Sequence, residues 1–78
     1  MTPPEAKEHA QAFAKAVRSI EKLPKDHRMP NLNQAWKIHG LPVQMAFHAL
    51  DGVGLYSIYG EVLRTYGQAV SAASNSAT

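Results

Sequence analysis

The stretch LYSIYGEVLRTYGQAV, residues 55–70, decides the fold of this chain. Its apolar side chains recur at alternating spacings of three and four, which places them on one stripe of an α-helix. The members of this stripe are Tyr56, Tyr59, Leu63, Tyr66 and Val70. Four neighbours widen it to about half of the circumference, beyond the roughly 100° of an ordinary surface helix: Leu55, Ile58, Val62 and Ala69. We therefore expect a helix that is covered on two sides. A β-hairpin over residues 55–59 is the alternative.

A first long helix is predicted over residues 3–23. Thr2 offers a hydroxyl cap, the two prolines that follow need no N–H there, and Glu5 suits the positive end of the helix dipole. The helix repeats the three-and-four spacing with Ala6, Ala10, Phe13, Val17 and Ile20. It is expected to end at Leu23, because the residue before a proline is pushed out of the helical region.

Two short helices are predicted in the middle of the chain. Residues 24–30, PKDHRMP, are expected to form a polar connector bounded by two prolines. Asn31 is expected to cap a helix over residues 32–39, which Gly40 ends. A third helix over residues 42–50 begins at Pro42 and is apolar on nearly all sides, so we place it in the middle of the domain.

The predicted architecture is a small all-α domain of four helices in the order long-short-short-long. It spans residues 1–70, and residues 71–78 form a flexible C-terminal tail. We expect the two long helices to lie antiparallel or crossed. The 78 residues include no cysteine, so no disulfides are formed and stability must come from helix packing or self-association. No signal peptide or membrane span is recognisable, and a cytoplasmic location is expected.

The net charge of the chain gives only weak support for nucleic-acid binding. Eight Lys and Arg residues stand against six Asp and Glu residues, for a formal net charge of +2. This balance excludes an acidic mimic of nucleic acid. Basic side chains nevertheless gather along one edge of the first helix and its connector. The candidate contacts with an acidic partner or with nucleic acid are Lys7, Lys15, Arg18, Lys22, Lys25 and Arg28. A solvated helix face is the simpler explanation.

Residues 35–50, AWKIHGLPVQMAFHAL, superficially resemble a helix-turn-helix, with a short helix, a glycine turn and a helix begun by proline. His39 stands before the glycine, where the usual pattern has an apolar residue. The second helix offers only Gln44 and His48 as polar side chains for base edges. This composition argues against sequence-specific DNA binding through the segment.

Neither a metal site nor a catalytic site is expected. The four histidines, His9, His27, His39 and His48, have no metal-ligand spacing, and no cofactor is predicted. His39 is explained by the dipole at a helix C-terminus. Glu61, Asp51 and His48 can be drawn as a triad, but no activated nucleophile accompanies them. The domain is also too small to enclose a ligand pocket of about 300 Å³. We therefore predict that the chain is not an enzyme.

Two glycines in the last helix carry the functional hypothesis. Gly60 and Gly67 lie seven residues apart, and each costs a helix about 1 kcal/mol relative to alanine. Close approach of another backbone would offset that cost, either from a helix of the same domain or from a second protein. The candidate surface for protein binding or self-association comprises Tyr56, Tyr59, Gly60, Leu63, Tyr66, Gly67 and Val70.

The sequence therefore favours a protein-binding regulator or inhibitor that docks a helical surface onto a larger protein or nucleoprotein complex and that forms a homodimer. Such profiles are common among accessory proteins of phages and mobile elements. Two alternatives stay open. One is a nucleic-acid-binding regulator that uses the basic edge of the first helix. The other is a structural subunit whose wide apolar face is buried in an assembly.

Overall fold

The computed structural model describes residues 2–49 and 54–75. In chain order the elements are α1 (Pro3–Ile20), α2 (Lys25–Ala35), the π-helical segment η1 (Trp36–Gly40), α3 (Leu41–Ala49) and α4 (Tyr56–Asn75). These residues contain no strand, so the all-α prediction is confirmed and the alternative of a hairpin at residues 55–59 is wrong. Four α-helices occur in the predicted order long-short-short-long, but η1 joins the two short ones without a break.

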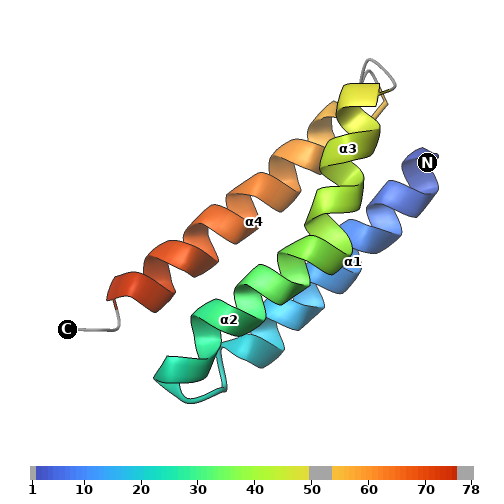
Figure 1. Ribbon diagram of the computed structural model, residues 1–78. Helices are drawn as coiled ribbons and strands as arrows, with labels where there is room; N and C mark the ends of the chain where they lie inside the picture. The colour runs from blue at the N-terminus through green and yellow to red at the C-terminus, as the bar shows by residue number, and fades with distance from the viewer. Residues whose placement is uncertain (1, 50–53, 76–78) are drawn as a thin grey trace.

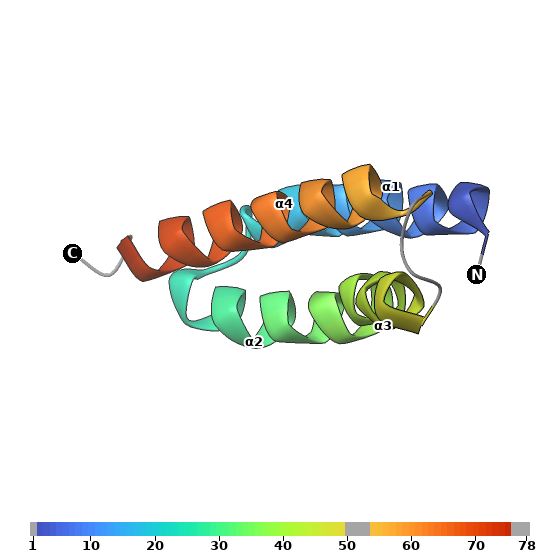
Figure 2. The ribbon, with the colours of Figure 1, turned by 90° about the horizontal axis from the view of Figure 1, so that it is seen from above.

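The helices form two layers (Figures 1 and 2). α1 and α4 lie side by side in one layer, and α2, η1 and α3 together form the other. The molecule is elongated, with extents of 40 × 17 × 14 Å. α1 and α4 run in the same direction, because the α2–η1–α3 helix doubles back between them. The expectation that the two long helices lie antiparallel or crossed is therefore wrong.

α1 begins with the predicted cap. The Glu5 N–H donates to Thr2 Oγ1 at 3.4 Å, and the Thr2 N–H donates to Glu5 Oε1 at 3.3 Å, so the two residues form a capping box. The Thr2 hydroxyl also donates to Glu5 Oε1, at 2.9 Å. The hydrogen bond from the Thr2 side chain, assisted by one from the Thr2 backbone, lowers the pKa of Glu5. At the other end α1 stops at Ile20, and the Arg28 side chain donates to the free carbonyl of Leu23 at 3.1 Å.

The predicted polar connector is helical. α2 begins at Lys25, directly after Pro24, and residues 25–30 lie within it. Pro30 lies in the second turn of α2 and removes one backbone hydrogen bond without breaking the helix. Asn31 is not a cap, because its side chain donates to the carbonyl of His27 one turn earlier in the same helix. Pro24 and Pro30 predicted a non-helical connector here. Burial of Leu32 and Ala35 in the core nevertheless stabilises the helix.

Gly40 does not form a turn between α2 and α3. It is buried in η1, where the Leu41 N–H donates to the Trp36 carbonyl in a bond that spans five residues. This wider turn accommodates Pro42, which has no N–H and whose ring would crowd the carbonyl of Ile38 in a regular α-helix. The two short helices are consequently joined into one rod.

α4 is longer than predicted. It continues through residues 71–75, which were expected to belong to the tail, whereas residues 76–78 lie outside the described residues. The extension has a packing reason, because Ala72 and Ala73 border a narrow space lined by Val17, Ile20 and Leu32 from the other helices. Alanine also has the highest helix propensity.

The core is divided into two clusters along the rod. The larger contains Phe13, Val17, Ile20, Leu32, Ala35, Val62 and Ala69. The smaller, near the N-terminus of α4, contains Ala6, Val43 and Leu55. Leu55, just before α4, and Val62 and Ala69 within it are buried and recur every seven residues. These buried residues lie beside the predicted stripe and not at its centre. Tyr56 and Leu63 of that stripe are consequently exposed.

Candidate functional site

One side of α4 is apolar and uncovered. Tyr56 is 73% exposed and Leu63 is 41% exposed, and both glycines of the helix are exposed as well. An added Cβ at either Gly60 or Gly67 would meet no atom within 4 Å. The glycines are therefore not explained by another helix that crosses within the domain. We call this surface the α4 outer face and define it as Tyr56, Gly60, Leu63, Gly67 and the half-buried Val70.

The other two tyrosines of the candidate surface face inward and hold α4 against its neighbours. Tyr66 stacks on Trp36 with ring centroids 4.7 Å apart, and its hydroxyl donates to Asn33 Oδ1 at 3.1 Å. Tyr59 stacks on Phe47 of α3 at 4.8 Å. The structure therefore splits the seven predicted residues into an open face of five and a supporting pair at its edge.

Trp36 belongs to this support. It is half-buried, contacts Phe13 edge-on at 6.1 Å and covers Gly40. A Cβ on Gly40 would lie 2.2 Å from Trp36 Cε3, a separation that atoms do not adopt. The absence of a side chain at Gly40 is thus what allows the indole ring to lie against the helix and reach Tyr66.

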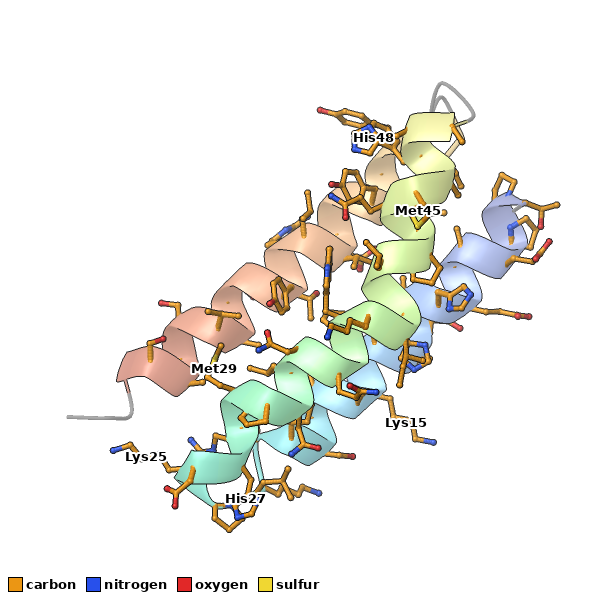
Figure 3. The ribbon with its side chains drawn as sticks, in the orientation of Figure 1. Lys15, Lys25, His27, Met29, Met45 and His48 are labelled. Atoms are coloured by element: carbon orange, nitrogen blue, oxygen red, sulfur yellow. The ribbon has the colours of Figure 1, made fainter. Side chains whose placement is uncertain are left out.

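α3 adds exposed apolar side chains beside α4. Leu41 and Met45 are exposed, Met45 to 64%. Figure 3 shows Met45 on the outside of α3, and it shows His48 on the side of α3 that is turned toward α4. His48 lies 6.0 Å from Tyr59 between ring centroids, and Phe47 lies 6.2 Å from Tyr56. The apolar surface of α4 therefore continues onto α3.

Two histidines meet where the sequence spacing gave no sign of a pair. His9 of α1 and His39 of η1 have ring centroids 5.8 Å apart. Desolvation lowers the pKa of His39, and the positive charge that His9 can carry lowers it further. His39 Nδ1 is buried without a hydrogen-bond partner. His39 lies inside a continuous helix, so its assignment to a helix C-terminus is wrong.

The histidine pair borders a groove of about 280 Å³ that is also lined by Glu5, Glu8 and Ala12. Within the described part of the chain, no group of three or more His, Asp or Glu side chains is placed to hold a metal ion. Sequence spacing missed the pair because thirty residues separate its members and the chain reverses direction between them.

The candidate basic residues do not share one surface. Lys7 lies beside α4, while Lys15 and Lys25 extend from different helices on opposite sides of the molecule (Figure 3). Arg28 is half-buried and is engaged with the Leu23 carbonyl. Arg18 and Lys22 are exposed at the end of α1 and just beyond it. The predicted basic edge is therefore divided among several faces.

An open groove of about 480 Å³ runs between α1 and α4. Small residues make it, among them Ala10, Ala14 and Ser57, and Lys7 and Glu61 are part of its walls. Its volume exceeds the 300 Å³ that we took as the lower bound for a ligand pocket, although it is a surface groove and not an enclosed cavity.

Two of the three residues that can be drawn as a triad, Glu61 and His48, lie on different sides of α4. Glu61 lines the groove toward α1, whereas His48 contacts Tyr59 on the side of α4 toward α3, and Asp51 lies outside the described residues. Residues 35–50, which the sequence argued against as a DNA-reading helix-turn-helix, have no turn, because η1 joins α2 and α3 directly.

Comparison of the chain with models of protein families, with curated proteins and with solved structures yields no match. Among residues 2–49 and 54–75, none of the helices is both long enough and apolar enough to cross a membrane. The geometry of the α4 outer face is accordingly the observation on which a functional proposal can rest.

Proposed function

We propose that this chain is a small, non-enzymatic recognition domain that docks onto another protein through the α4 outer face. By covering part of that protein, it regulates or inhibits it. The observation that carries the proposal is the open space at Gly60 and Gly67 on a face where Tyr56 is 73% exposed.

The two glycines of α4 carry an energetic cost that the described part of the chain does not offset. Each interior glycine costs the helix about 1 kcal/mol relative to alanine. Among residues 2–49 and 54–75, no atom lies within 4 Å of the position where either side chain would begin, so packing among them does not offset that cost. A partner protein that packs closely against the bare backbone at these two glycines would offset the cost. Tyr56 and Leu63 on either side of Gly60 would then supply apolar contact, and tyrosine is enriched among the residues that dominate binding energy.

The helix that carries the face is packed against its neighbours from behind. Tyr59 and Tyr66 stack on Phe47 and Trp36 behind it, and the Tyr66 hydroxyl is hydrogen-bonded to Asn33. A surface that is already ordered loses less conformational entropy when it binds. This support favours docking of the folded domain over a mechanism in which α4 rearranges.

Nucleic-acid binding has less support. Phosphate recognition needs basic side chains that can reach one backbone together. Lys15 and Lys25 extend on opposite sides of the molecule (Figure 3), and Arg28 is already engaged with the Leu23 carbonyl. A structural subunit of an assembly would use the α4 outer face, so the test below detects that role too.

The test is a photo-reactive residue placed at Tyr56, expressed in the cells from which the chain comes. Irradiation is expected to give discrete protein adducts from this position. The matched control places the same residue at Lys15, which is exposed on α1 and points away from the bundle. Equal adduct patterns from the two positions, or none from Tyr56, would contradict the proposal.

A second variant separates docking from folding. Gly67→Leu places a side chain into open solvent above the face, so the fold should be retained. The adducts formed at Tyr56 should disappear in this background, while the helical circular dichroism signal stays the same. Adducts that survive Gly67→Leu would show that the face is not the contact.

A further inference from the structure

We propose that His9 and His39 together bind one zinc ion, which links α1 to η1 and stabilises the folded chain. The site is the groove of about 280 Å³ that the two histidines border, and no residue of the α4 outer face lines it. The proposal is therefore independent of the proposed function. Three observations support it: the distance between the two rings, a buried nitrogen of His39 that has no partner, and the charge around the groove.

The two rings lie at a separation that suits a shared ion. A zinc ion lies about 2.0–2.1 Å from the imidazole nitrogen that binds it, so two imidazoles that share a tetrahedral ion have ring centroids about 5–6 Å apart. The centroids of His9 and His39 are 5.8 Å apart, and the ring planes are inclined at 52° to each other. Rotation of the side chains about their own bonds, without movement of a helix, then directs one nitrogen of each ring at a common ion.

The fold brings the two ligands together, which is why their spacing in the sequence predicted no metal site. His9 lies in α1 and His39 lies in η1, thirty residues later, and these two elements pack against each other. The unfolded chain does not hold the rings at this distance. An ion that binds both rings therefore binds the folded state more tightly and stabilises it. η1 is also a π-helical turn, and such turns within helices are frequent at functional sites.

His39 has a buried nitrogen that the described part of the chain does not satisfy. Its Nδ1 atom is buried without a hydrogen-bond partner. Such an atom costs stability, and a bound ion is one way to satisfy it. Nδ1 can bind the ion itself, or the ring can turn over about the Cβ–Cγ bond so that a carbon takes the buried position. Burial also lowers the pKa of His39, which keeps the ring in the neutral form that a metal requires.

The charge around the two rings favours a cation. Glu5 and Glu8 line the groove, and the described residues that line it include no lysine or arginine. Carboxylates near a bound cation stabilise it by Coulomb attraction. Among residues 2–49 and 54–75, no third His, Asp or Glu is placed to complete a set of ligands, so water takes the remaining positions on the ion. Such a site binds zinc reversibly and more weakly than a structural site with four protein ligands.

Residue-specific NMR tests the site directly, because the four histidines supply two ligands and two controls. His27 and His48 are exposed on α2 and α3 and have no part in the site. Metal is first removed from the natural chain with a chelator, and zinc chloride is then added. The imidazole signals of His9 and His39 should move, while those of His27 and His48 stay in place. Equal shifts at all four histidines would show adventitious binding to single imidazoles and would overturn the proposal.

Melting temperatures test whether both ligands act together. Zinc at ten times its dissociation constant, measured by titration calorimetry, should raise the melting temperature of the natural chain by roughly 5–10 °C. The chelator should reverse this rise. His9→Gln should abolish it with an unchanged helical circular dichroism signal, because His9 is half-buried on the surface of α1. His48→Gln is the matched control and should keep the rise. A rise that survives in His9→Gln, or none in the natural chain, would overturn the proposal.

Discussion

Two kinds of helical glycine lie within one small domain, and they have opposite surroundings. Gly40 in η1 is buried under Trp36, and a side chain there would collide with the indole ring. Gly60 and Gly67 in α4 face open space. The first is required by the packing of the chain with itself. Packing within the described part of the chain does not explain the other two.

Removing the ring over Gly40 should have the largest effect. Trp36→Ala removes the contacts with Phe13 and Tyr66 and should cost about 3 kcal/mol of stability. Chemical denaturation measures the loss. Gly40→Ala should cost far less in the Trp36→Ala background than in the natural chain, because the colliding ring is gone. Equal costs in both backgrounds would show that the tight contact is not why Gly40 is needed.

Filling the space at Gly40 should have the next largest effect. Gly40→Ala forces the Trp36 ring off Tyr66, and we expect a destabilisation of about 1–3 kcal/mol even though alanine favours the helix. Tryptophan fluorescence should change together with the melting temperature. An unchanged spectrum with a higher melting temperature would contradict the packing described at η1.

The same substitution in α4 should act in the opposite direction. Gly60→Ala and Gly67→Ala should each stabilise the monomer by about 0.5–1 kcal/mol, because helix propensity improves and nothing is displaced. Thermal melts at low protein concentration measure this gain. Self-association should weaken in both variants, since the backbones are held further apart. A destabilised Gly67→Ala monomer would mean that the glycine has an internal role.

The smallest predicted effect is a pH dependence of stability that arises from His39 in η1. Because burial and His9 lower the pKa of His39, the folded state favours the neutral ring. Stability is then fully present above the ordinary histidine pKa of about 6.5 and declines as the pH falls from there toward the lowered value. The melting temperature should be lower at pH 5.5 than at pH 7.5.

Glu5 and Glu8 line the same groove, and a lowered pKa keeps the titration of Glu5 below this pH range. His39→Gln should therefore reduce the pH dependence, whereas His27→Gln, at an exposed position on α2, should leave it in place. A pH dependence that His39→Gln does not alter would place its origin elsewhere in the chain.

Local signals in the sequence predicted a large part of this fold. The cap at Thr2 and the three-and-four spacing located α1 and α4, because those features act within a few residues. The middle of the chain was misjudged for the opposite reason. Pro30, Gly40 and Pro42 look like breaks, but tertiary packing and one π turn keep the helix continuous. Local helix propensity gives no indication that Trp36 would cover Gly40.

The candidate site was partly predictable for the same reason. Spacing placed Tyr56, Gly60, Leu63 and Gly67 on one side of a helix, and the structure keeps them there. Spacing did not show which edge of the wide stripe would be buried, because that depends on where α2 and α3 pack. It also could not pair His9 with His39 across a reversal of the chain.

The most direct test of the α4 outer face as an association surface is solution mass by light scattering on the natural chain and on Gly67→Leu, at low and high salt. We predict twice the 8.5 kDa chain mass for the natural protein at both salt concentrations. Gly67→Leu should have the mass of one chain and an unchanged helical circular dichroism signal. A single-chain mass for both proteins would contradict self-association through this face, and an unfolded Gly67→Leu variant would show that the glycine has an internal role.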